Sequence, residues 1–182
     1  MFDNMVNCGF VQPDCFSNCC NNSCPCNFNN KNNCCCTQSG GKRNSYNAIN
    51  ALALTSVAVP VGSAIPFDTN RVLSGNAINH VAGSTDFTIM APGTYKATLT
   101  TNAALNTGEV AGFVSIAIAI NGTIIPGCLV SQTIAPTETT NLYTQVLFTI
   151  PCGTPATVTA VNPVGAAPTV YTNTNMIIEK VC

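Results

Sequence analysis

Cysteine is the residue type whose number and spacing in this sequence most clearly imply chemistry. The chain has 12 cysteines in 182 residues, and nine of the 12 precede residue 37. An odd number of thiols leaves at least one that must find a partner elsewhere when all are oxidised. A disulfide between two adjacent cysteines closes a strained ring, whereas each of the two can bond to a different chain without that strain. We therefore predict intermolecular disulfides at Cys8, Cys15, Cys19, Cys20, Cys24, Cys26, Cys34, Cys35 and Cys36.

The same thiolates can also bind a soft metal ion in a cluster, as in metallothioneins. The sequences Cys24-Pro25-Cys26 and Cys34-Cys35-Cys36 fit that alternative. However, the segment has no histidine and no Cys-x-x-Cys pair, so the ligand spacing of a structural zinc finger is missing. A reduced, disordered tail is the third interpretation. We assign no metal site and no cofactor.

Three further cysteines lie in the second part of the chain. Cys182, at the end of the sequence, can reach a neighbouring subunit and make a head-to-tail covalent contact, so we add it to the intermolecular candidates. The alternative for Cys182 is an inert thiol. Cys128 and Cys152 each follow a glycine or proline at the end of a predicted strand, and we keep them as domain cysteines without an assigned role.

The sequence does not contain a recognisable catalytic centre. Nucleophilic catalysis needs a base beside the nucleophile, and His80, the only histidine, is interpreted as a loop residue. The acidic residues are too dispersed to suggest a carboxylate pair. We predict that the protein is not an enzyme and assign no catalytic residue. The acidic residues considered were Asp68, Asp86, Glu109, Glu138 and Glu179.

The chain has two main segments of opposite composition, joined by a short linker. Residues 1–36 have asparagine-rich spacers and few large apolar side chains, so they cannot bury a core of their own. Residues 37–45 are polar and rich in turn formers, which is typical of a linker. We predict a crosslinking arm at 1–36, a linker at 37–45 and a β domain at 46–182.

The predicted domain consists of short runs rich in Val, Ile, Thr, Phe and Tyr, separated by Gly, Pro and Asn. This pattern is typical of an all-β sandwich. In 113–120 large apolar residues alternate with Ser115, Ala117 and Ala119, a small face that another sheet or subunit can approach closely. Asn121-Gly122 then predicts a type I′ hairpin. The predicted strands are 51–59, 87–90, 94–101, 113–120, 142–150, 157–161 and 175–181.

Charge and hydropathy exclude several classes of partner. Only 7% of the residues are charged and the net charge is −1, whereas an ordinary soluble domain has about 25% charged residues. The six basic residues are scattered, so no nucleic acid or anionic membrane partner is expected. No apolar run is long enough to span a bilayer. The first residues lack the pattern of a secretory signal, so we do not expect Sec export.

Several segments resemble, in order, the C-terminal domain of the collagen-like exosporium glycoproteins of Bacillus, the BclA family. The resemblance covers residues 50–182, and the last of these segments is the most specific. It implies an all-β jelly roll like that of tumour necrosis factor, a tight trimer, and display on the spore surface. The segments are 64–69 (AIPFDT), 87–89 (FTI), 93–96 (GTYK), 118–122 (IAING) and 177–181 (IIEKV).

The chain departs from that family in one respect, because it has no Gly-X-Y repeat that would form a collagen stalk. A cysteine-rich arm takes the place of the stalk. We therefore predict a structural protein of the exosporium or a spore appendage, made in the mother cell, trimeric through its jelly roll and crosslinked by disulfides. Its partners are itself and other spore-coat or appendage proteins. The alternative is an adhesion module that recognises a glycan or a host protein.

Overall fold

The computed structural model describes residues 46–109, 112–153, 155–163 and 166–181. Within these residues all regular elements are strands, and no helix is present that could cross a bilayer. The predicted all-β class is therefore confirmed. The strands are β1 (Ala48–Ala53), β2 (Val57–Val59), β3 (Thr69–Ser74), β4 (Ile78–His80), β5 (Phe87–Ile89), β6 (Gly93–Leu105), β7 (Gly112–Ile120), β8 (Thr123–Ile124), β9 (Val130–Ile134), β10 (Thr139–Ile150), β11 (Ala156–Val161) and β12 (Thr169–Lys180).

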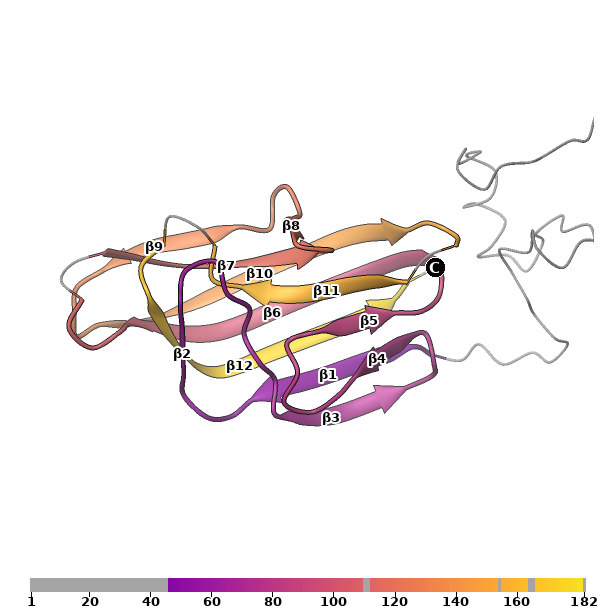
Figure 1. Ribbon diagram of the computed structural model, residues 1–182, viewed down its shortest axis with the longest axis horizontal. Coiled ribbons are helices and arrows are strands. Elements are labelled where there is room, and N and C mark those ends of the chain that lie inside the picture. Colours follow the sequence, from indigo (N-terminus) through magenta and orange to yellow (C-terminus); the bar gives the residue numbers. More distant parts are fainter. Residues whose placement is uncertain (1–45, 110–111, 154, 164–165, 182) are drawn as a thin grey trace, which may run out of the picture.

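The strands form two antiparallel sheets that pack against each other (Figure 1). The first sheet has the order β10-β6-β12-β1-β3, and β2 also pairs with β12. The second sheet has the order β4-β5-β11-β7-β8, and β9 also pairs with β7. Between β3 and β12 the chain passes repeatedly from one sheet to the other, and the last strand returns beside the first. This arrangement confirms the predicted jelly-roll sandwich.

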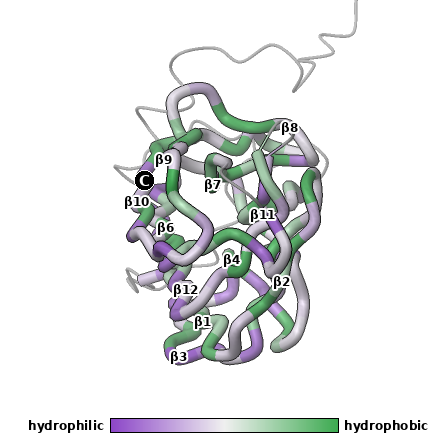
Figure 2. The backbone as a smooth tube through the Cα atoms, turned by 90° about the vertical axis from the view of Figure 1, so that its left-hand side faces the viewer, coloured by the Kyte–Doolittle hydropathy of each residue, from purple (hydrophilic) through white to green (hydrophobic). Residues whose placement is uncertain are grey.

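The core lies between the sheets because alternate residues of each long strand point inward. Along β6, for example, Tyr95, Ala97 and Leu99 are fully buried and their neighbours are only partly buried. The end-on view in Figure 2 shows hydrophobic and hydrophilic residues alternating along the tube in both layers. The buried hydroxyl of Tyr171 on β12 donates a hydrogen bond to the Ser115 carbonyl on β7, which connects the two sheets.

The predicted hairpin is confirmed. Strands β7 and β8 pair through Ala119↔Ile124 and Ile120↔Thr123. Asn121 and Gly122 have φ values of 49° and 79°, the two positive angles that a type I′ turn requires.

Other strand predictions need correction. The predicted run 51–59 is two strands, β1 and β2, separated by the bend at residues 54–56. Strands β3, β4 and β9 were not predicted. They are short or carry polar side chains in succession, so they lack the apolar pattern by which the other strands were found.

The arm at 1–36 and the linker at 37–45 lie outside the described residues, and the proposed division of the chain stays a prediction. The described domain begins at Tyr46 and continues into β1. After β3, the chain turns sharply at Gly75, where φ is 76°. A Cβ at this position would meet the side-chain oxygen of Asn47 at 2.0 Å. That oxygen accepts hydrogen bonds from the N–H groups of Asn76 and Ala77, so the turn depends on glycine.

Candidate assembly surface

The side of the first sheet that faces away from the core exposes several apolar side chains. We call it the outer face. The strand register places outward residues of successive strands in rows, for example Leu147–Lys96–Glu179–Ala48 and Tyr143–Thr100–Asn175–Leu52. The outer face comprises Tyr143, Gln145 and Leu147 on β10, Lys96, Thr98 and Thr100 on β6, Asn175, Ile177 and Glu179 on β12, Ala48, Asn50 and Leu52 on β1, and Val72 on β3.

Apolar side chains lie at both lateral edges of the outer face. On β10, Tyr143 is 53% exposed and Leu147 is 62% exposed. On β3, at the opposite edge, Val72 is 45% exposed. Ile177 lies between them on β12 and is partly buried. Exposed apolar side chains that share one face with few charges are typical of a protein–protein interface.

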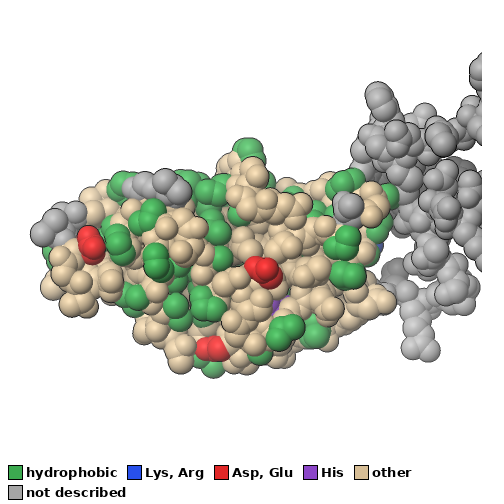
Figure 3. Space-filling view, in the orientation of Figure 1, with side chains coloured by type: hydrophobic (Ala, Val, Ile, Leu, Met, Phe, Trp, Pro, Cys, Tyr) green, Lys and Arg blue, Asp and Glu red, His purple; other side chains and the backbone are tan. Residues whose placement is uncertain are grey.

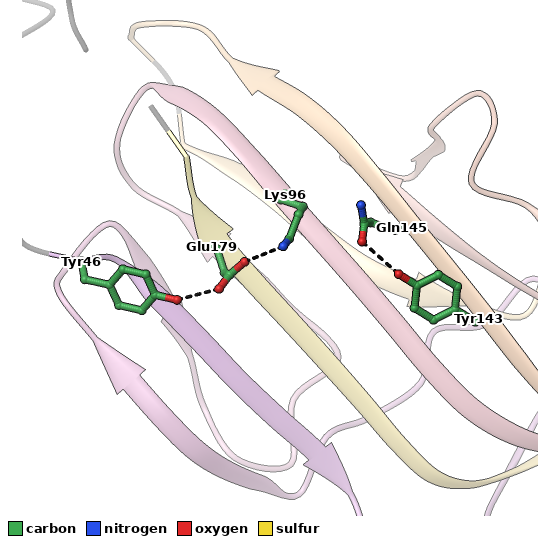
Figure 4. Close-up of polar contacts among 5 residues, drawn as sticks. All are labelled: Tyr46, Lys96, Tyr143, Gln145 and Glu179. Carbon is green, nitrogen blue, oxygen red and sulfur yellow. Dashed lines mark hydrogen bonds and ion pairs between the residues drawn. The ribbon is translucent and has the colours of Figure 1, made fainter. Parts of the chain in front are cut away.

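The charges on the outer face compensate each other. The Lys96 Nζ lies 2.9 Å from a carboxylate oxygen of Glu179, and the Tyr46 hydroxyl donates a hydrogen bond of 2.6 Å to the other oxygen (Figure 4). The hydroxyl of Tyr46 and then the ammonium of Lys96 lower the pKa of Glu179, because both stabilise the carboxylate. Next to this network, Tyr143 donates to Gln145 (Figure 4). The outer face therefore has no net charge.

The corresponding surface of the second sheet is different around β7. The small outward residues Ser115, Ala117 and Ala119 are almost inaccessible to solvent. Ser115 donates to the carbonyl of Val130 and contacts the Ser131 hydroxyl, both on β9. The small face predicted for close approach is thus already buried within this chain. Figure 3 shows the rest of this side of the molecule as mostly neutral, with isolated acidic groups.

Cys128 is a buried, free cysteine. Its Sγ accepts a hydrogen bond from the Ile118 N–H at 3.2 Å and lies 3.0 Å from the carbonyl oxygens of Ile118 and Ile125. Ile118 faces the gap between β8 and β9, where no strand residue supplies an acceptor for its N–H. The thiol fills that gap, so Cys128 stabilises the β7 edge.

Cys152 lies just beyond the end of β10 and is disulfide-bonded. The register pairs Ile150 with Gly93, Lys180 with Tyr95 and Ala48 with Glu179. The start of β1, the end of β12 and Cys152 therefore share one end of the sandwich (Figure 1). The other candidate cysteines, namely Cys8, Cys15, Cys19, Cys20, Cys24, Cys26, Cys34, Cys35, Cys36 and Cys182, lie outside the described residues, and their pairing stays a prediction.

His80 was expected in a loop, and this expectation is wrong. His80 lies in β4, is buried, and stacks on Phe87 with ring centroids 4.3 Å apart. Its Nδ1 is 2.7 Å from the Asn70 side-chain oxygen, and its Nε2 is 3.1 Å from the Ser84 carbonyl oxygen. Asn70 also donates to the His80 carbonyl oxygen. These bonds connect β3 of the first sheet to β4 of the second, so His80 has a structural role.

The described residues form no charged or metal-ligating pocket for a small ligand. An open hollow of about 370 Å³ is lined by apolar side chains and one asparagine, without a charged group. Among the described residues, no cluster of three or more His, Cys, Asp or Glu side chains could hold a metal ion. The hollow is lined by Ala58, Val59, Pro60, Val61, Asn106 and Pro168.

The chain is similar to several solved structures, among them the globular domain of zebrafish complement 1qA protein, with 12% sequence identity and a TM-score of 0.48. The match covers 75% of this chain and 98% of that chain. No protein-family model matches the sequence, and no curated protein matches it. The resemblance to the collagen-like spore glycoproteins stays a prediction from the sequence segments given above.

Proposed function

We propose that this protein is a structural subunit of the bacterial spore surface, in the exosporium or an appendage. Three copies associate through their outer faces, and disulfides from the arm at 1–36 then join trimers into larger assemblies. The observation that carries this proposal is the outer face itself. It combines apolar side chains at its two edges with charges that already compensate each other.

A threefold arrangement uses both edges of the outer face. In a ring of three copies, the β10 edge of each copy lies against the β1–β3 side of the next, so two different patches meet at every contact. Tyr143 and Leu147 on β10 would pack against Val72 of the neighbour, the apolar side chain exposed at that edge. Burial of such side chains stabilises the assembly by about 25 cal/mol per Å² of apolar area removed from water.

The arm fits a second level of assembly. The described domain enters β1 at the same end of the sandwich as Cys152 and the end of β12. A disulfide formed at that end of the sandwich does not disturb the pairing of the outer-face strands within the sheet. Subunits made in the mother cell would trimerise first and oxidise after the cell lyses. Disulfides between trimers would then give the assembly kinetic resistance to unfolding.

The test is gel electrophoresis, with and without reductant, of protein extracted from spores and of purified protein oxidised in air. We expect high-mass bands that collapse on reduction to the 18.9 kDa of one chain. Deleting residues 1–36 should leave a soluble trimer that forms no such bands. A matched variant with the nine arm cysteines replaced by serine should behave like the deletion. A monomer band without reductant, or unchanged bands from the truncated protein, would contradict crosslinking by the arm.

A further inference from the structure

Two asparagines in the middle of the outer face have side-chain oxygens for which the described residues supply no hydrogen-bond donor. Asn50 lies on β1 opposite Ile177, and Asn175 lies on β12 opposite Leu52, so the two amides are diagonal neighbours. The side-chain oxygens of both residues are buried and accept no hydrogen bond. In contrast, Asn141, on β10 of the same face, donates to a backbone carbonyl and to the Asn102 side chain.

The stability of an isolated protomer does not explain these two residues. A buried amide oxygen without a donor costs free energy that it would recover in water. The positions opposite them are occupied by Leu52 and Ile177, and a β-branched or aliphatic residue would pack well in such a row. Asparagine is also a poor strand former. The described residues provide no donor for these two oxygens, and a partner at the outer face would supply one.

A second copy of this chain satisfies the chemistry of the pair better than an unrelated partner. Each amide has both a donor and an acceptor, so it can bond to a polar side chain of a neighbouring copy, such as Gln145 on the β10 edge. The outer face has no net charge, which gives an acidic or basic partner no electrostatic advantage. The terminal Asn torsion is broad, so a small rotation brings a covered oxygen to the surface of the face.

We propose that Asn50 and Asn175 hydrogen-bond to polar side chains of neighbouring copies and fix the number and register of the subunits. This inference rests on the proposed association through the outer face. Apolar contacts alone are not directional and allow several arrangements of similar stability. A buried asparagine in an apolar interface can restrict the assembly to one of them, since every other register leaves its amide unsatisfied.

The test is native mass spectrometry and sedimentation of the full chain with reductant, so that disulfides do not contribute. The wild type should form one species, a trimer. The double variant Asn50→Leu/Asn175→Leu should still associate but lose the single trimer peak and give a mixture of sizes, without a fall in melting temperature. Asn79→Leu, an exposed asparagine on the second sheet, is the matched control and should leave the trimer unchanged.

The experiment distinguishes a wrong role for the asparagines from a wrong proposal for the assembly. If the double leucine variant stays a homogeneous trimer with the dissociation constant of the wild type, the role of the asparagines is wrong while the proposed assembly stands. If the wild type is a monomer at every concentration, the proposed assembly itself is wrong. A second variant, Asn50→Asp/Asn175→Asp, brings like charges together and should lose the trimer at neutral pH. A trimer that survives this change would also overturn the inference.

Discussion

The outward side chains of β7 in the second sheet and of β10 in the first sheet differ in size and exposure. Three outward residues of β7 in the second sheet, namely Ser115, Ala117 and Ala119, are small and almost inaccessible to solvent, and Ser115 donates to β9. The outward residues of β10 in the first sheet include Tyr143 and Leu147, which are more than half exposed. Among the described residues, the small outward side chains of β7 are thus covered, whereas Tyr143 and Leu147 on β10 are exposed. This difference supports the proposal that the outer face is available to another copy.

A charge on the covered side of the second sheet should have the largest effect on stability. Ala117→Arg puts a cation where no solvent reaches, so the domain should lose up to about 5 kcal/mol of stability. Thr98→Arg, on the outer face, is the matched control and should leave the fold intact. Thermal unfolding followed by circular dichroism measures both. Equal melting temperatures for the two variants would contradict the difference between the sheets.

The second prediction concerns association. Replacing both Tyr143 and Leu147 by Glu removes the apolar edge of the outer face and adds like charges. Each contact between copies should lose about 4 kcal/mol, by analogy with interface residues whose removal costs about 2 kcal/mol each. Sedimentation with reductant should then show a folded monomer. Thr88→Glu on the second sheet is the control, and a trimer that resists the double change would place the interface elsewhere.

The third prediction concerns the hydrogen bond that the Cys128 sulfur accepts beside β7. Cys128→Ala removes the sulfur that accepts the Ile118 N–H and should destabilise the domain by about 2 kcal/mol. Cys128→Ser keeps a donor and an acceptor at this place and should cost less. Chemical denaturation of the two variants gives the comparison. A larger loss for serine than for alanine would show that the thiol acts only as an apolar filler.

The smallest effect is a pH dependence at the edge where the two sheets meet. Burial lowers the pKa of His80 below its usual 6.5, although the Ser84 carbonyl and Asp86 oppose the shift. The folded state therefore favours the neutral ring, and stability should be full above pH 6.5 and fall as the pH drops below it. His80→Gln should remove this part of the pH dependence in urea titrations. A wild type that gains stability on acidification through this range would reverse the sign.

The sequence predicted the parts of the fold that depend on local chemistry. Asn121-Gly122 supplies its own turn, and the alternation in 113–120 carries over to β7. It did not predict β3, because Arg71, Val72 and Leu73 in succession do not alternate. His80 was misplaced for a related reason. Its burial depends on Asn70 and Phe87, which only the folded chain brings next to it.

The outer face and the role of Cys128 could not be predicted from the sequence for the same reason. The cysteines were visible in the sequence, but the role of Cys128 required the gap between β8 and β9. The outer face was not visible, because its residues come from five strands that pair across long separations in the chain. Asn50 and Asn175 are 125 positions apart and become neighbours only through the pairing of β1 with β12. Register, which fixes such neighbours, follows from packing of the whole sandwich.

The most direct test of the central claim is to trap the contact between copies with a photoreactive phenylalanine analogue. It would replace Tyr143 on the outer face in one sample and the exposed Asn79 on the second sheet in another. After illumination, gels run with reductant exclude disulfides. We predict dimer and trimer bands for position 143, with crosslinks mapping to β1 or β3 of the neighbour, and no such bands for position 79. Bands from position 79 alone would contradict assembly through the outer face.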